Sequence, residues 1–146
     1  MGLLICLAGF VLAFYAGRRS LGAGLCVVLT VGYAYGMVRA QVPDAAAYFA
    51  FDVTLLGFYA AAFGTPTAPS TRPRVRAALV WTLLLCAWPA LLIVLPDAGL
   101  LVRLVGLRAA VLLVPMVLLG ARASAEDLRL VGSWLLALNL GAFGVG

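Results

Sequence analysis

The chain contains neither histidine nor lysine, and each absence narrows the chemistry open to it. Histidine is the commonest general base and metal ligand near neutral pH. Without it, Ser-His-Asp and Cys-His catalytic groups and histidine-based metal sites are excluded within this chain. We therefore predict no metal site. We also name no catalytic residue and expect no cofactor.

Cysteine is also scarce. Cys6, Cys26 and Cys86 each lie inside an apolar run, far from one another in the sequence. This spacing fits neither a disulfide framework nor a zinc site. We interpret all three as small apolar packing residues.

Charged residues make up only 10% of the chain, whereas 66% of its residues are hydrophobic and the mean hydropathy is +1.17. A soluble domain carries roughly 25% charged residues. This chain therefore has too few ionic groups to cover a surface that faces water. Its repeated apolar runs of about 20 residues are typical of helices that cross a lipid bilayer. We predict an all-α fold, a polytopic transmembrane helical bundle whose first partner is the bilayer.

The net charge of +5 comes from ten arginines scattered between the apolar runs. That distribution is typical of topology determinants at the ends of membrane helices, so nucleic-acid binding is not expected. Arginine without lysine, together with abundant Ala, Gly, Val and Leu, indicates a GC-rich bacterial coding sequence. We predict a multi-pass protein of the bacterial inner membrane.

The apolar runs predict about six spans within a single transmembrane domain, residues 1–146. The first run follows Met1 directly and lacks the basic region and cleavage site of a signal peptide, so we expect an uncleaved helix. The last run ends without a flanking charge or aromatic anchor, and we expect the chain to be the N-terminal part of a larger protein. The predicted spans are 2–17, 20–38, 45–64, 77–95, 104–121 and 130–146.

Two polar stretches separate the later runs. Residues 65–76 hold three prolines and three arginines, which predicts an extended surface loop. In the stretch 122–129, Ser124 precedes Asp127 by three residues, which predicts a cap for the last helix. Between them, the segment 98–121 is short for a full span. We expect an interfacial stretch leading into a helix, with a re-entrant helix as the alternative.

The arginines also predict the orientation of the chain. With six spans, seven arginines fall on one side of the bilayer and three on the other. Positive residues stay in the cytoplasm, so we predict that both termini are non-cytoplasmic. Loss of the fifth span would reverse the C-terminus. The seven are Arg18, Arg19, Arg72, Arg74, Arg76, Arg122 and Arg129, and the three are Arg39, Arg103 and Arg108.

The three arginines on the outer side are the candidate substrate-binding residues. Guanidinium groups near the membrane surface suit bidentate contact with phosphate or pyrophosphate oxygens. Arg108, Arg39 and Arg103 are therefore candidate pyrophosphate contacts. The alternative is that they reach lipid headgroups or pair with nearby carboxylates.

Asp52 is the carboxylate inside a predicted span, about 10 Å below the start of its helix. A carboxylate at that depth needs a partner or a wet cavity. Arg39 is the nearest candidate, and an Arg39–Asp52 ion pair would clamp the hairpin of the second and third spans. A substrate or proton role is the alternative. Tyr48, Asp52 and Tyr59 share a helical face, which fits a cavity lining or a packed interface.

Small and polar residues predict helix contacts. Gly32 and Gly36 form a Gly-xxx-Gly pair that permits close helix packing. Asn139, in the last apolar run, is expected to be an interhelical hydrogen-bond donor or to mark a cavity. Further helices, of the same or a partner chain, are the expected contacts.

Two stretches resemble the O-antigen ligase and O-antigen polymerase-like family of bacterial membrane proteins. The first is Gly32 to Tyr59 (GYAYGMVRAQVPDAAAYFAFDVTLLGFY), and the second runs from Val102 to Gly146. In that family a Gly-Leu-Arg element leads into an apolar helix, followed by a short acidic loop and another helix. The matching elements here are Gly106-Leu107-Arg108, Ala125-Glu126-Asp127-Leu128 and the helix from Trp134 onward.

The resemblance implies handling of glycans linked to undecaprenyl pyrophosphate, on the outer side of the inner membrane and without metal or nucleotide. Family members carry a large periplasmic loop with catalytic arginine and histidine positions in their later half. This sequence has neither that loop nor a histidine. The resemblance therefore implies an N-terminal half or truncated homologue that is not catalytic alone. Arg108 would line the path of the carrier's pyrophosphate, with Arg39 and Asp52 in support.

Two other functions remain open. A small non-enzymatic accessory protein would pack its helices against those of a partner. Half of a transporter would need polar groups near the bilayer midplane and broken helices. Asp52, Asn139 and the prolines are the residues of that kind, and Asp52 is predicted near the outer end of its span.

Overall fold

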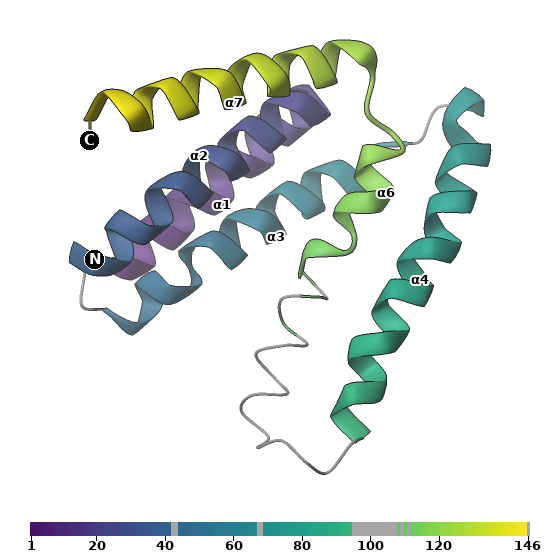
Figure 1. The fold of residues 1–146 in the computed structure, drawn as a ribbon, viewed down its shortest axis with the longest axis horizontal. Helices are drawn as coiled ribbons and strands as arrows, with labels where there is room; N and C mark the ends of the chain where they lie inside the picture. The colour runs from purple at the N-terminus through teal and green to yellow at the C-terminus, as the bar shows by residue number, and fades with distance from the viewer. Residues whose placement is uncertain (42–43, 67–68, 95–107, 109, 111, 146) are drawn as a thin grey trace. The chain divides into compact units, whose positions relative to one another are not determined.

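The structure is a computed structural model, shown in Figure 1, that describes residues 1–41, 44–66, 69–94, 108, 110 and 112–145. Its described residues are almost entirely helical and contain no strand, which confirms the predicted all-α class. The chain divides into two compact units, and each is described on its own. The first unit comprises residues 1–66 and 123–146, and the second comprises residues 67–122.

The first unit is built from four long helical stretches (Figure 1). They are α1 (Gly2–Arg19), α2 (Leu21–Gln41), the 3-10 helix η1 (Ala45–Phe49) continuing into α3 (Ala50–Phe63), and α7 (Ala125–Val145). The second unit contains a short 3-10 helix, a long helix and a short one. They are η2 (Pro69–Thr71), α4 (Arg72–Val94) and α6 (Met116–Gly120).

Three helical stretches among the described residues are long and apolar enough to cross a membrane: Gly2–Arg19, Ala46–Phe63 and Pro69–Leu91. Because these helices have the length and hydropathy of spans, the protein is assigned to a membrane. The number of about six spans stays a prediction.

Helices α1 and α3 run in the same direction (Figure 1). The residue numbers of contacting positions rise along both helices. Gly2 lies beside Asp44, Gly9 beside Thr54, and Gly17 beside Ala61. Every fully buried position of α1 is small, which lets the two backbones approach closely. Those positions are Gly2, Cys6, Gly9, Ala13 and Gly17.

Gly57 of α3 shows how close that approach is. A Cβ atom added at Gly57 would lie 2.9 Å from the Cα of Phe10, which is backbone and cannot turn aside. Around this contact lie the largest fully buried side chains of the unit, Phe58, Leu55 and Thr54. The core of the first unit is therefore the α1–α3 interface.

Helices α2 and α7 form a second parallel pair, although 105 residues separate their first contact in sequence. The contacts again rise in number along both helices: Gly22 with Asp127, Thr30 with Trp134, and Tyr33 with Asn139. Because α2 returns from the end of α1 after a single residue, this second pair runs opposite to the first.

The loop predicted over 65–76 is wrong from Arg72 onward, because α4 begins there. A proline in the first turn of a helix costs no hydrogen bond, since the first N–H groups have no intrahelical partner. Pro73 therefore does not delay the helix, and arginine is a good helix former. Pro89 lies inside α4 without ending it.

The span predicted over 104–121 stays a prediction, and its described part is helical with an interruption. In its described part, Arg108, Ala110 and 112–113 are helical, a turn follows at Val114 and Pro115, and α6 begins at Met116. Pro115 has no N–H to continue the helical ladder. Residues 95–107, where this predicted span begins, lie outside the described residues.

Of the Gly32–Gly36 pair, Gly32 lies against a side chain of a neighbouring helix. A Cβ atom at Gly32 would lie 3.2 Å from the ring of Phe51 on α3, whereas nothing lies within 4 Å of one at Gly36. Close packing is thus seen at Gly32, and packing through Gly36 stays a prediction. The small residues of α1, spaced three and four apart, are those that pack.

Candidate functional site

The described residues do not test whether the three predicted pyrophosphate contacts form one site. Arg108 is helical and half-buried in the second unit. Arg39 lies near the end of α2 in the first unit, and its side chain is outside the described set. Arg103 lies wholly outside the described residues. The Arg39–Asp52 ion pair therefore stays a prediction.

Asp52 lies in the first turn of α3 and is half-buried. A carboxylate in a first turn interacts favourably with the positive end of the helix dipole. The face predicted for Tyr48, Asp52 and Tyr59 is not uniform, because Tyr48 belongs to η1 and is exposed while Tyr59 is buried. Tyr59 packs against the rings of Phe58 and Phe63.

Asp44 joins the N-termini of α1 and of the η1–α3 stretch. Its carboxylate accepts hydrogen bonds from the N–H of Ala46 at 3.0 Å and from the N–H of Gly2 at 2.8 Å. The ammonium group of Met1 lies 3.4 Å away. The thiol of Cys6 adds a bond to the carbonyl of Ala46 at 3.2 Å. One side chain thus caps both helices of the first parallel pair.

The electrostatics of Asp44 follow from these bonds. The N–H groups of Ala46 and Gly2, and to a smaller extent the terminal ammonium, hold the pKa of the carboxyl below its usual value. The ionised form is therefore the one built into the fold. This capping role of Asp44 was not predicted from the sequence. The signal was available: an aspartate directly before a helical run is a preferred N-cap.

Asp127 performs the same task for the second parallel pair. Its carboxylate accepts the N–H of Gly22 in the first turn of α2 at 2.6 Å, and the N–H and hydroxyl of Ser124 at 3.0 and 2.8 Å. The hydroxyl of Ser124 in turn accepts the N–H of Asp127 at 3.1 Å. This reciprocal capping box confirms the predicted cap of the last helix.

Burial raises the pKa of Asp127, but the N–H groups of Ser124 and Gly22 and the Ser124 hydroxyl outweigh it, and the net shift is downward. A Cβ atom at Gly22 would lie 2.8 Å from the Cα of Asp127. Glycine is therefore required where the first turns of the two helices meet. Ser20 completes this end by accepting the N–H of Ala23 at 3.0 Å.

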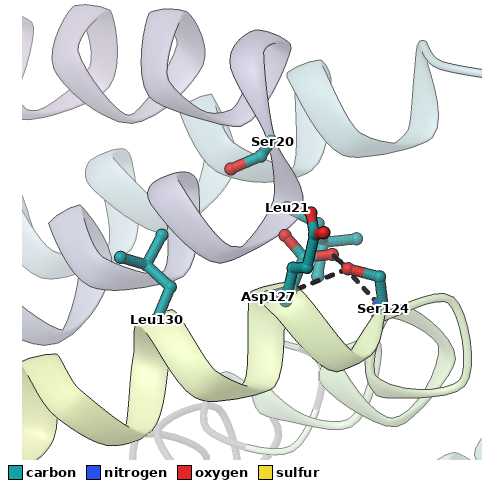
Figure 2. Close-up of a pocket in the computed structure, with 6 residues that line it drawn as sticks. Ser20, Leu21, Ser124, Asp127 and Leu130 are labelled. Atoms are coloured by element: carbon teal, nitrogen blue, oxygen red, sulfur yellow. Dashed lines mark hydrogen bonds between the residues drawn. The ribbon is translucent and has the colours of Figure 1, made fainter.

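Figure 2 shows a pocket of about 380 Å³ where α2 and α7 begin. It is open, and polar and apolar groups share its lining. Because two carboxylates line it and that of Asp127 already accepts the neighbouring N–H groups, the pocket suits a neutral or cationic polar group rather than a phosphate. The lining residues are Ser20, Leu21, Ser124, Glu126, Asp127 and Leu130.

Beyond the pocket, two further side-chain bonds link α2 and α7; together with the Gly22–Asp127 bond we call them the polar seam. The indole N–H of Trp134 donates to the Thr30 hydroxyl at 2.8 Å, and the Tyr33 hydroxyl donates to the Asn139 amide oxygen at 2.9 Å. Asn139 thus forms an interhelical bond, but the predicted donor role is wrong: its amide oxygen accepts from Tyr33, while its amide nitrogen donates to the carbonyl of Leu135 in its own helix.

The polar groups of Asp44, Asp127 and the polar seam therefore hold helices together. Among the described residues, no cluster of three carboxylate, thiol or imidazole side chains could hold a metal ion. In comparisons with known proteins, no family model, no curated protein and no solved structure matches the chain.

Proposed function

We propose that the protein is a multi-pass scaffold of the bacterial inner membrane, a non-enzymatic subunit whose helices pack against those of a partner membrane protein. The observation that carries this proposal is the environment of α7. Within the first unit, α7 packs mainly against α2, and it presents large apolar side chains elsewhere. Leu136, Leu140 and Phe143 are 62%, 63% and 85% exposed.

The glycines of the two parallel pairs support the same role. Each glycine of α1 lies against a neighbouring helix or its capping residue. By contrast, Gly132 and Gly141 of α7 have no atom within 4 Å of the space that a Cβ would fill. A further helix could therefore approach the backbone of α7 as closely as α3 approaches α1.

The helix directions support six spans. Because α2 and α7 are parallel, α7 starts on the side of the bilayer where α1 and α3 end. If all four stretches cross, the chain between α3 and α7 must cross an even number of times. Since α4 has the length and hydropathy of one span, a second crossing lies between α4 and α7. The total is then six.

This direction also supports the orientation that we propose. Arg18 and Arg19 at the end of α1, and Arg129 in the first turns of α7, lie at the same end of the unit. The positive-inside tendency assigns that end to the cytoplasm and both termini to the opposite side. A cysteine introduced at Ser70 is expected to react with a membrane-impermeant maleimide only from the cytoplasmic side.

Site-specific photo-crosslinking tests the scaffold role. A photoreactive amino acid is placed at Leu136 or Leu140 of α7, and at Leu4 of α1, which is 70% exposed. After irradiation of intact cells, mass spectrometry identifies the adducts. We expect the α7 positions to give one discrete protein adduct and the Leu4 position to give lipid adducts.

Adducts that stay within the chain, or lipid adducts at all three positions, would contradict the scaffold role. A protein adduct at Leu4 equal to that at Leu136 would also contradict it, because contact would then not depend on the open surface of α7.

A second candidate function is the handling of undecaprenyl-pyrophosphate-linked glycans by an O-antigen ligase-like protein. The observation that favours it is the half-burial of Arg108, a guanidinium group in an otherwise apolar stretch of the second unit. Such a group is costly in a membrane unless it serves a site or a partner.

A photoreactive undecaprenyl-pyrophosphate probe separates the two functions. If the carrier binds here, Arg108→Gln reduces labelling of the purified protein by about tenfold, the scale set by loss of a charge-assisted hydrogen bond. Arg122→Gln, a matched change at another half-buried arginine, serves as the control. Equal labelling of the three proteins would remove the glycan function and leave the scaffold role untouched.

A further inference from the structure

The start of α4 carries three arginines within five residues, Arg72, Arg74 and Arg76, and all three are exposed. The first turn of this helix contains no acidic residue. In the part of the chain that the structure describes, none of the three guanidinium groups has an ion-pair partner. This basic cluster is therefore available to an anion from outside the chain.

The positive charge of the cluster lies at the end of α4 where the helix dipole is also positive. The N-terminus of a helix is the positive end of its dipole, so arginine there is unfavourable unless an anion compensates. Helix α7 follows the rule, with Glu126 and Asp127 in its first turn. Because α4 begins with the opposite charge, its start is suited to bind negative groups.

The rest of α4 supplies a membrane setting. The stretch Pro69–Leu91 is long and apolar enough to cross the bilayer, and only 6% of its apolar window is buried inside the structure. Trp81 and Trp88 are 64% and 68% exposed. Residues 76 to 91 rise about 22 Å along the helix axis, most of the hydrocarbon thickness. The arginines therefore lie at headgroup level when the apolar part is immersed.

We propose that the basic cluster of α4 binds the phosphates of anionic lipids. Arg72 and Arg76 are one helical turn apart on the same face, whereas Arg74 lies about 200° around the axis, so the helix engages phosphates on two sides. Guanidinium groups bind phosphate oxygens in bidentate fashion. This inference goes beyond the scaffold role and needs only that α4 is immersed in the bilayer.

Fluorescence quenching by brominated lipids measures this preference. In a Trp88→Phe/Trp134→Phe background, the remaining Trp81 lies about 7.5 Å beyond Arg76 along the axis, near the depth of acyl-chain bromine. The protein is reconstituted in equal mixtures of phosphatidylglycerol and phosphatidylcholine, with one of the two brominated. We expect phosphatidylglycerol to be favoured beside Trp81 by about fivefold, the scale of one engaged arginine.

A triple Arg→Gln variant at 72, 74 and 76 is expected to lose the preference. The matched control removes the same charge elsewhere, by Arg18→Gln, Arg19→Gln and Arg129→Gln, and is expected to keep it. If the first variant does not fold, as judged by circular dichroism, the unmodified cluster is measured in 0.5 M NaCl, where screening must reduce the preference.

Three results would overturn the proposal. They are equal quenching by the two lipids in the parent protein, an equal loss in the control variant, and a preference that salt does not change. The second of these would show that net charge, and not the start of α4, attracts the lipid.

Discussion

The two parallel helix pairs of the first unit solve the same packing problem with different chemistry. Helices α1 and α3 meet through glycine and alanine, and the backbone of Phe10 lies against Gly57. Helices α2 and α7 meet through the polar seam, whose side chains remain largely exposed. Yet each pair begins with one shared aspartate, Asp44 or Asp127, at its two N-termini.

The difference predicts how the stability of each interface responds to mutation. In a bilayer, helices associate through close packing of small residues and through hydrogen bonds between side chains. The α1–α3 pair depends on the close packing of small residues, so its stability should be sensitive to added side-chain volume. The α2–α7 pair depends on side-chain hydrogen bonds and on the Asp127 cap. Loss of any one of these bonds should therefore lower the free energy of unfolding only slightly.

Added volume in the α1–α3 interface should have the largest effect. Gly57→Leu is expected to lower the free energy of unfolding by about 3 kcal/mol, the upper end for overpacking, because the blocking atoms belong to the Phe10 backbone. Unfolding in mixed micelles, followed by circular dichroism during an SDS titration, measures the change. Gly132→Leu, where space is open, is the control and should stay within about 0.5 kcal/mol.

Loss of the shared cap of the α2–α7 pair should rank second. Asp127→Ala is expected to cost about 1–2 kcal/mol in the same assay, because the N–H groups of Gly22 and Ser124 both lose their acceptor. As the control, Glu126→Ala removes the same charge at the preceding residue, which is exposed. If the two variants were equally stable, the cap would have no part in joining the helices.

A single bond of the polar seam should contribute less. A double-mutant cycle of Thr30→Val and Trp134→Phe is expected to give a coupling energy of about 0.6 kcal/mol, the average for hydrogen bonds between membrane helices. Strictly additive losses would mean that this bond does not stabilise the pair. Thr82→Val, whose hydroxyl bonds a carbonyl of its own helix, pairs with Trp134→Phe as the uncoupled control.

Acid should affect both pairs, and only at low pH. The pKa values of Asp44 and Asp127 are lowered in the folded protein, so the unfolded chain binds more protons at acidic pH. Their contribution is complete above about pH 4, the ordinary carboxyl value, and is lost as the pH falls through the folded pKa. The contribution of these two carboxylates to the free energy of unfolding should not change between pH 5 and pH 8.

Asp127→Asn removes one of the two titrating caps and should make the acid loss shallower. An acid transition identical in the parent and in this variant would show that the carboxylate charge at position 127 does not stabilise the fold.

Local features of this chain were predictable from its sequence, and long-range pairing was not. The cap at Ser124 follows from residues three apart, and the helices of the first unit follow from apolar length. The start of α4 at Arg72 was missed because prolines and arginines resemble a loop, although Pro73 is tolerated in a first helical turn.

The candidate site was harder to predict because its contacts join distant parts of the chain. Asp127 meets Gly22 across 105 residues, and nothing in either local sequence specifies the other. For the small residues of α1, the repeat of Cys6, Gly9, Ala13 and Gly17 was visible, but a Gly-xxx-Gly pair such as Gly32 and Gly36 looks equally favourable. Which pair packs is decided by the tertiary fold.

The parallel direction of α2 and α7 is the claim on which the six spans, the orientation and the scaffold role depend. Pulsed electron paramagnetic resonance in nanodiscs tests it, with spin labels at Ser20 and Ser124 in one sample and at Ser20 and Ala142 in another. Because α7 rises about 26 Å from residue 125 to residue 142, parallel helices give the shorter distance for Ser20 and Ser124, by roughly 15 Å or more. The reverse order would mean antiparallel helices and would contradict the account.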